Sequence, residues 1–275
     1  KKKILLLICI LILLLFIYTT KAYDENLSKH AVDLAEASYC VSTIDEWNGS
    51  TCEPSIILTN IVENDGLRSL LGYDGVLNSL FISFRGSSNI ENWIDNIRIK
   101  KIAPYNDTNI EVEKGFYKEY NNSKIELMDN LSRLSKKYNT NNIFLTGHSS
   151  GAAMATLTAF DILSIYNDYY ELKYLITFGS PRVGNEYFSQ YFNKFSFTSY
   201  RVTHYYDMVP HVPEEFLGFL HLSNEIWYNR ENSEYKICDD LYGEDSTCSN
   251  SCSPMRCTST SDHLYYLNVT MGNED

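Results

Sequence analysis

A serine flanked by glycines stands near the middle of the chain. Residues 144–151 read Phe-Leu-Thr-Gly-His-Ser-Ser-Gly, an apolar run that leads into the pattern G-x-S-x-G. A serine on a sharp turn between a strand and a helix needs small residues two positions before and after it. Gly147 and Gly151 meet this demand around Ser149. We therefore predict that Ser149 is a nucleophile; the alternative is an ordinary Gly/Ser turn.

A nucleophilic serine needs a base, because its hydroxyl reacts poorly at neutral pH. In α/β-hydrolases, which present their serine on such a turn, the chain order is serine, acid, histidine. His204 falls inside a predicted strand and His211 inside a proline-containing turn. His221 and His263 come late enough in the chain to follow an acid, and the spacing alone leaves both open.

The base in turn needs a carboxylate that orients it. Asp207 is the first carboxylate after the predicted strand at 199–204, and an acid of this kind belongs on a loop at a strand end. The alternative is that Asp207 only caps a turn.

An oxyanion hole requires two N–H donors aimed at the developing negative charge. The residue after the nucleophile supplies one, which here is Ser150 at the start of a helix. The loop that follows the predicted strand at 79–85 is suited to supply the other, because Gly86 permits close approach and Ser87 can donate its N–H and its hydroxyl.

Strands and helices alternate through the middle of the chain. Strands are predicted at 55–62, 79–85, 142–147, 174–178 and 199–204, and helices at 28–41, 115–138 and 151–166. This alternation favours the α/β class, with a mostly parallel central sheet and helices on both faces. Beyond about Leu217 the pattern breaks into short polar pieces, which we predict to be loops. Residues 23–275 are expected to form one α/β-hydrolase domain.

The first residues have the character of a secretory leader. Three lysines precede an apolar run from Ile4 to Ile17, and a small residue follows at Ala22, so we predict a signal peptide over 1–22. An uncleaved signal anchor is the alternative. Cleavage would remove four lysines and no acids and change the formal charge from −12 to −16, which argues against nucleic-acid binding. We expect a secreted protein with no stable membrane span after cleavage.

Six of the seven cysteines lie beyond the leader, an even number that suits an oxidising compartment. Proximity in sequence favours the pairs Cys40–Cys52, Cys238–Cys248 and Cys252–Cys257 among fifteen possible pairings. A zinc site is the weaker alternative, because no C-x-x-C pair accompanies them. Glycosylation sequons begin at Asn26, Asn48, Asn106, Asn121, Asn130 and Asn268.

Six segments together resemble the class 3 lipases, the fungal triacylglycerol lipase family. They are FRGSSNIENWIDNI (84–97), VEKGFYKEY (112–120), IFLTGHSSGAAMATLTAFDI (143–162), TFGSPRVGN (177–185), YRVTHYYDMVPHVP (200–213) and DHLYYL (262–267). The resemblance assigns the roles of nucleophile, acid and base to Ser149, Asp207 and His263. It makes Ser87 and Ser150 the oxyanion donors and leaves His221 a structural or surface residue. No metal or organic cofactor is implied.

The resemblance also implies a lid over the site. Ile90, Trp93, Ile94 and Ile97 recur at helical spacing, so a short helix there would have one apolar face. Such a face suits a lipid substrate at an oil–water interface. The alternative is that these side chains simply belong to the core.

The chain departs from the family at several positions. Glu113 replaces the usual histidine, Ser150 the usual leucine, and Ala152 a usual glycine. A backbone donor survives these changes, so they bear on substrate preference more than on catalysis. Acylglycerols are the expected substrates; a phospholipase A1 and a feruloyl-type esterase are the near alternatives. A catalytically silent lipid-binding protein is the remote one. The sequence leaves the oligomeric state open.

Overall fold

A central sheet of eight strands organises the molecule. The computed structural model describes residues 23–47, 55–64, 66–87, 89–97, 99–238, 243–252 and 256–272. The strand order is β1-β2-β3-β6-β7-β8-β9-β10, which follows the chain except for a separate β4–β5 pair. The strands are β1 (Ile56–Asn64), β2 (Leu67–Asp74), β3 (Ser79–Phe84), β6 (Asn142–His148), β7 (Glu171–Phe178), β8 (Thr198–His204), β9 (Glu225–Tyr228) and β10 (Tyr235–Ile237).

The inner strands run parallel and the outer strands antiparallel. β3, β6, β7, β8 and β9 pair in parallel, whereas β1, β2 and β3 form an antiparallel meander and β10 returns antiparallel to β9. The predicted fold class is therefore confirmed: the sheet is that of an α/β-hydrolase, and its parallel strands all end at the same edge.

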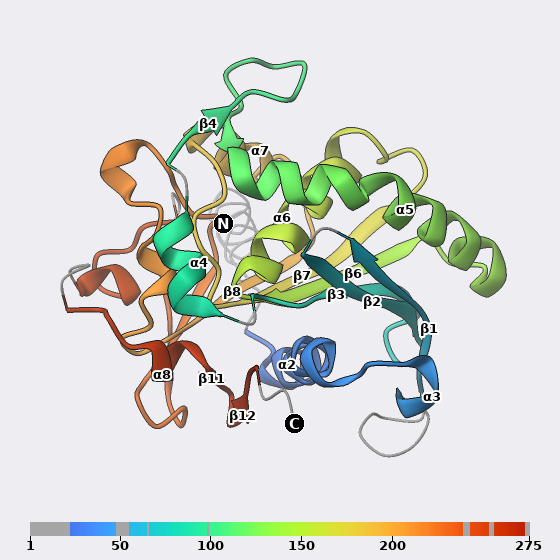
Figure 1. Cartoon of the computed structure of the whole chain (residues 1–275), viewed down its shortest axis with the longest axis horizontal. Coiled ribbons are helices and arrows are strands. Elements are labelled where there is room, and N and C mark those ends of the chain that lie inside the picture. The colour runs from blue at the N-terminus through green and yellow to red at the C-terminus, as the bar shows by residue number, and fades with distance from the viewer. Residues whose placement is uncertain are drawn as a thin grey trace, which may run out of the picture.

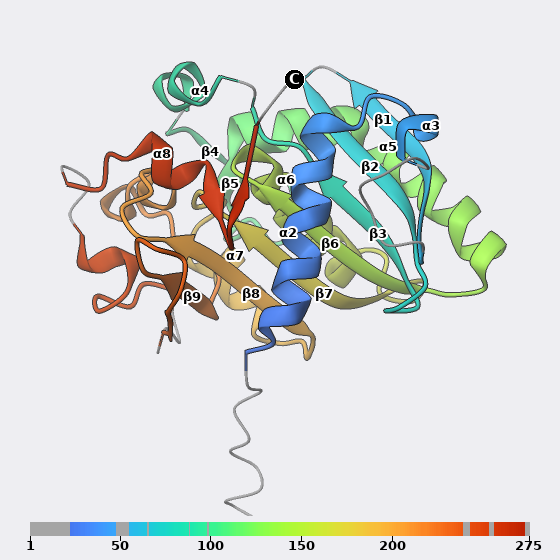
Figure 2. The same cartoon turned by 90° about the horizontal axis from the view of Figure 1, so that it is seen from below.

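Helices cover both faces of this sheet. α2 (Glu25–Cys40) crosses one face, as Figure 2 shows, and α5 (Lys114–Tyr138), α6 (Ser150–Ser164) and α7 (Glu186–Phe192) lie on the other (Figure 1). The remaining elements are short: α3 (Ile44–Trp47), α4 (Ile90–Asn96), α8 (Thr260–His263), β4 (Lys101–Ile102), β5 (Val112–Glu113), β11 (Tyr265–Tyr266), β12 (Val269–Thr270), and the 3-10 turns Val209–His211, Glu215–Leu217 and Ser249–Ser251.

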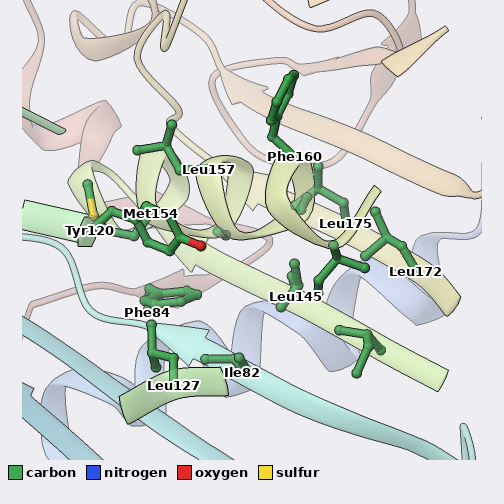
Figure 3. Packing of buried hydrophobic residues seen from close by; sticks show 14 of the residues in the cluster. Ile82, Phe84, Tyr120, Leu127, Leu145, Met154, Leu157, Phe160, Leu172 and Leu175 are labelled. Atoms are coloured by element: carbon green, nitrogen blue, oxygen red, sulfur yellow. The ribbon is translucent and has the colours of Figure 1, made fainter. Parts of the chain in front are cut away.

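Alternate strand residues divide the core into two clusters, as the two-residue period of a strand requires. Ile82 and Phe84 of β3 point with Leu145 of β6 toward α6, where they pack among Met154, Leu157 and Phe160 (Figure 3). Phe81 and Phe144, which precede Ile82 and Leu145 on the same strands, point to the opposite face and belong to the cluster beneath α2. Burial on both faces explains the nearly continuous apolar sequence of these inner strands.

α6, the helix that follows the nucleophile, is buried along nearly its whole length. Its alanines let it lie close to the sheet, and α5 lies beside it on the same face, where it also packs on β1 and β2. α2 is tied to the opposite face by two side chains of the sheet: the hydroxyl of Ser83 donates to the Leu34 carbonyl at 2.6 Å, and that of Thr146 donates to the Ala31 carbonyl at 3.3 Å. These two bonds fix α2 in register with β3 and β6.

The structure corrects the sequence analysis at the edges of the sheet. The prediction omitted β2, whose arginine, glycine and aspartate interrupt an otherwise apolar pattern. It also assigned everything beyond Leu217 to loops, whereas β9 and β10 extend the sheet there. These strands have only four and three residues, too few for a periodic pattern to stand out from the surrounding polar sequence.

Two of the three predicted disulfides are confirmed. Cys238–Cys248 and Cys252–Cys257 are bonded. Cys52, the predicted partner of Cys40, and the predicted leader over 1–22 lie outside the described residues. Within the described part, no helix is long and apolar enough to cross a membrane.

Candidate active site

The sequence-predicted site residues gather at the edge where the parallel strands end. β6 ends at His148 and passes directly into Ser149. β3 ends three residues before Ser87, and β8 ends three residues before Asp207. His263 closes α8, and the segment before it is held beside Asp207 by an isolated bridge to Ser259.

Ser149 occupies the strained turn that the motif predicts. Its φ of 59° and ψ of −128° lie outside the regions that residues other than glycine usually adopt. Its N–H donates to the Phe178 carbonyl of β7 at 3.0 Å, and its carbonyl accepts from the Ala152 N–H at 3.0 Å. The neighbouring strand and the new helix therefore hold this backbone in place.

The two glycines of the motif are required by close backbone approach. A Cβ at Gly147 would lie 2.5 Å from the Gly151 carbonyl oxygen. A Cβ at Gly151 would lie 2.2 Å from the Phe84 carbonyl oxygen of β3. Both separations are shorter than any real contact, so only glycine fits on either side of Ser149.

His263 and Asp207 form a buried hydrogen-bonded pair. Nδ1 of His263 lies 3.0 Å from Oδ1 and 2.9 Å from Oδ2 of Asp207. A carboxylate only accepts, so Nδ1 carries the proton and Nε2 is left as the proton acceptor. The His148 ring, next to Ser149 in the chain, lies against His263 with ring centroids 4.4 Å apart. His263 is thus beside the turn that carries Ser149.

Further donors converge on the Asp207 carboxylate. The Tyr266 hydroxyl donates to Oδ2, and the Val209 N–H donates to Oδ1 at 2.8 Å. Burial by itself raises the pKa of Asp207, but the charge of His263 and these hydrogen bonds outweigh it and hold the pKa below its ordinary value. Asp207 is therefore ionised and able to orient the imidazole.

Two reactive atoms are buried without a partner. Ser149 and His263 are both completely inaccessible to solvent, and neither Oγ of Ser149 nor Nε2 of His263 has a hydrogen-bond partner in the described part of the chain. Buried polar atoms normally find partners. Other buried side-chain atoms of the described residues, such as Oγ of Ser69 and Oγ of Ser123, also lack a partner, but Oγ of Ser149 and Nε2 of His263 are the two atoms between which a serine hydrolase transfers its proton.

The predicted oxyanion residues face one another through their side chains. Oγ of Ser87 lies 3.3 Å from Oγ of Ser150. Ser150 is buried at the first turn of α6, where the helix dipole favours negative charge, and Ser87 is half-buried. The structure thus brings the two predicted donors together, and it adds a hydroxyl contact that a leucine after the nucleophile would lack.

The predicted lid residues Ile90, Trp93 and Ile94 lie on α4, a short helix at the same edge of the sheet, and Ile97 follows it as the C-cap (Figures 1 and 2). The Asn89 side chain caps it by accepting the Asn92 N–H at 3.0 Å. Ile90, Trp93, Ile94 and Ile97 are all half-buried, and the Trp93 ring stacks on Phe116 with centroids 5.9 Å apart. Trp93 is packed against the main core cluster, so both the lid and the core alternative stay predictions.

The other candidate histidine has a structural position. Nε2 of His221 donates to the Pro210 carbonyl at 2.7 Å. Burial, reinforced by the charges of Arg201 and Arg182, lowers the pKa of His221 well below its ordinary value. The structure does not bring His221 to Asp207, so the choice between the two histidines falls on His263.

Two site residues escaped the sequence analysis. Tyr266 belongs to the DHLYYL segment, but only the folded chain brings its hydroxyl to Asp207. Gly179 follows β7 with φ of +54°, and a Cβ there would lie 2.9 Å from both Oδ2 of Asp207 and Nδ1 of His263. A steric limit of this kind has no signature in a single sequence beyond the glycine itself.

Glu113, where the family has a histidine, caps a helix instead of entering the site. Its carboxylate accepts the Phe116 N–H at 2.7 Å at the start of α5. A separate cluster with metal-ligand spacing contains Glu225, Cys238 and Cys248. Its two sulfurs are joined in a disulfide, so among the described residues this cluster cannot serve as the zinc site considered from the sequence.

The chain is similar in sequence and in fold to known lipases. Residues 81–217 match the family model described as Lipase (class 3). A lipase of Rhizomucor miehei is 35% identical over 202 residues, which are 70% of this chain and 53% of that relative. The chain therefore spans about half the length of that relative.

Two further similar proteins are covered over a larger share of their own length. A secreted mono- and diacylglycerol lipase of Fusarium solani is 29% identical over 241 residues, 81% of this chain and 71% of the relative. The solved structure of a triacylglycerol lipase whose catalytic centre is formed by a serine protease triad superposes with a TM-score of 0.81 at 28% identity, over 92% of this chain and 97% of the other.

Proposed function

Because the chain belongs to the class 3 lipase family, a family of ester hydrolases, we propose that it is a serine carboxylic-ester hydrolase that acts on acylglycerols. The observation that carries the proposal is the buried His263–Asp207 pair beside the strained Ser149 turn, with Oγ and Nε2 both unpartnered. The Fusarium relative is secreted. With the predicted leader, this supports action outside the cell.

In the first half of the reaction, Oγ of Ser149 attacks the ester carbonyl carbon. Nε2 of His263 takes the serine proton and returns it to the departing alcohol, so the C–O ester bond breaks and an acyl-enzyme remains. In the second half, water attacks the acyl carbon with the same proton relay and releases the fatty acid. Two easy transfers thus replace one difficult hydrolysis.

Asp207 acts through the histidine and does not take the proton itself. Its ionised carboxylate keeps the Nδ1–H tautomer of His263 in place and stabilises the imidazolium that forms during each transfer. Tyr266 and the Val209 N–H anchor this carboxylate, so the imidazole keeps one orientation throughout the cycle.

Ser87 and Ser150 stabilise the tetrahedral intermediates in this proposal. Their backbone N–H groups and the Ser87 hydroxyl would bind the negatively charged oxygen. Because the site is shielded from water, these hydrogen bonds would stabilise the transition state strongly. Removing one donor from such a hole costs other serine hydrolases about 10²–10³ in turnover.

The half-buried apolar face of α4 supports a lipid substrate. Exposing a large apolar side chain to water costs about 1.5–3 kcal/mol when it is fully buried and less for these half-buried ones, whereas a lipid surface accepts it. Displacement of α4 is thus disfavoured in water and favoured at an oil–water interface. The complete burial of Ser149 is consistent with a site that opens only there.

The test compares three substrates: emulsified long-chain triacylglycerol, phosphatidylcholine vesicles and a short soluble aryl ester. Wild-type protein is assayed with Ser149→Ala, and with Ser42→Ala as the matched control on an exposed serine. We expect the highest rate on emulsified triacylglycerol, rising above its solubility limit, with loss in Ser149→Ala only. A preference for phosphatidylcholine or for the soluble aryl ester would overturn the proposed substrate, and hydrolysis that persists in Ser149→Ala would overturn the mechanism.

A further inference from the structure

A buried hydrogen-bonded chain connects the two halves of the site through residues that the reaction scheme leaves unused. The Gly86 N–H, next to Ser87, donates to Oη of Tyr39 at 3.0 Å. Oη of Tyr39 lies 2.7 Å from Nδ1 of His148, and Nε2 of His148 lies 2.8 Å from the His263 carbonyl oxygen. The chain thus runs from the oxyanion loop to the backbone of the catalytic base.

The direction of every bond in this chain follows from its ends. The His263 carbonyl can only accept, so Nε2 of His148 carries the proton and donates to it. Burial, together with the nearby charge of His263, lowers the pKa of His148 to about 3, so the ring is neutral at working pH. Its Nδ1 is then an acceptor for the Tyr39 hydroxyl proton, and a lone pair on Oη accepts the Gly86 N–H.

The network is tightly packed as well as fully bonded. A Cβ at Gly86 would lie 2.2 Å from Oη of Tyr39, 2.7 Å from the His148 carbonyl oxygen and 2.9 Å from Cβ of Ser149. The oxyanion loop therefore rests directly on the tyrosine hydroxyl and on the nucleophile turn. A small displacement of Tyr39 must move the loop that holds Ser87.

Tyr39 is itself held by the scaffold. It lies on the buried face of α2, and this helix is fixed to β3 and β6 by the hydroxyls of Ser83 and Thr146. The phenol ring packs beside His148 with ring centroids 5.9 Å apart. A helix on the far face of the sheet thus provides the fixed point to which both halves of the site are attached.

We propose that Tyr39 and His148 are positioning residues that keep the oxyanion loop and the proton-accepting histidine in register with Ser149. This inference rests on the proposed hydrolase function and deepens it. Neither residue touches the substrate. They act through Gly86 and through the backbone of His263, so their loss changes turnover and leaves substrate binding largely intact.

Three variants separate the links of the chain. Tyr39→Phe keeps the ring but removes the hydroxyl. In His148→Gln the amide nitrogen reaches the Nε2 position and keeps the donor to the His263 carbonyl, while the acceptor for Tyr39 is lost. The third variant combines both changes. Tyr23→Phe is the matched control, because Tyr23 is another buried tyrosine whose hydroxyl lies 3.0 Å from that of Tyr228, away from the site.

The experiment measures kcat and KM on a soluble ester, together with thermal stability, in all variants, wild type and Ser149→Ala. In Tyr39→Phe we expect kcat to fall about tenfold or more and KM to stay within about twofold, since small misplacements in a site can cost up to about 10² in rate. Tyr23→Phe should lose stability with unchanged kcat. The kcat of the double variant should fall no further than that of the more impaired single variant, because both changes break the same hydrogen-bonded chain.

Contrary outcomes are distinct. A Tyr39→Phe enzyme with wild-type kcat would overturn the proposal while leaving the hydrolase function intact. Losses that multiply in the double variant would show two independent effects and would overturn the single connected chain. Ester hydrolysis that is absent in wild type, or equal in Ser149→Ala, would instead refute the underlying function.

Discussion

Tyr266 donates its hydroxyl proton to Oδ2 of Asp207, the same carboxylate that accepts Nδ1–H of His263. The hydroxyl is fully buried, and burial with the adjacent Asp207 charge raises the pKa of Tyr266 well above its ordinary value. Tyr266 is therefore a permanent donor. The acid of the proposed triad is held by the strand that directly follows the base.

Replacing Tyr266 by phenylalanine tests this arrangement. A hydrogen bond to a buried charge contributes about 1.5–3 kcal/mol, so we expect a comparable loss of unfolding free energy and a roughly tenfold lower kcat. The pKa of Asp207 should rise without this donor, which moves the loss of activity at acid pH to higher pH. Tyr265→Phe removes a hydroxyl that bonds Asn268 away from the site and should change neither value.

The Ser87 hydroxyl is predicted to bind the oxyanion in addition to the backbone N–H. Ser87→Ala removes only the hydroxyl, and we expect kcat to fall by up to about 10²–10³ with KM little changed. Ser150→Ala keeps its backbone donor and should cost far less. Steady-state kinetics on the soluble ester measure both variants. Equal losses of kcat in Ser87→Ala and Ser150→Ala would mean that the two hydroxyls, 3.3 Å apart, share the binding of the oxyanion.

Trp93 is predicted to contribute to activity only at an oil–water interface. Trp93→Ser removes its stacking on Phe116 and the largest apolar side chain of α4, so activity on emulsified triacylglycerol should fall about tenfold or more while activity on the soluble ester changes little. Ile125→Ser alters an apolar side chain on α5 that is already 76% exposed and serves as the control. Equal losses on both substrates would contradict the lid.

Stability should decline as the pH falls below about 6.5. Burial lowers the pKa of His148 to about 3 and also lowers those of His211 and His221. Between the ordinary histidine pKa of about 6.5 and the lowered pKa in the folded protein, the unfolded chain binds a proton that the folded chain does not. In this pH range the free energy of unfolding falls by about 1.4 kcal/mol per pH unit for each such histidine. The depressed pKa of Asp207 acts in the same direction at lower pH.

One group opposes this trend. Burial and the charge of Glu113 raise the pKa of Glu119 to about 7, so Glu119 binds a proton on folding and favours the native state as the pH falls. We expect the histidines to outweigh it. Urea unfolding at several pH values between 4 and 7 measures the slope, and His221→Gln, which retains a donor for the Pro210 carbonyl, should flatten it. A profile without slope would refute this account.

Much of the fold was predictable because the inner strands and α6 are buried on both sides and so have strong sequence patterns. The Ser149 turn was predictable for a local reason: Gly147 and Gly151 have no steric alternative. The short strands β9 and β10 have no such signal. Tyr39 and Tyr266 lie far from Ser149 in the chain, and only the packing of α2 and β11 against the strand ends gives them contact with the site.

The central claim is that Ser149 is the nucleophile. The most direct measurement is covalent labelling of the protein with a fluorophosphonate ester in the presence of detergent micelles, followed by peptide mapping by mass spectrometry. We predict one label per chain, on Ser149, with ester hydrolysis lost in proportion to labelling and no label in Ser149→Ala. Labelling of a different residue, or full hydrolysis after Ser149 has been modified, would contradict the account.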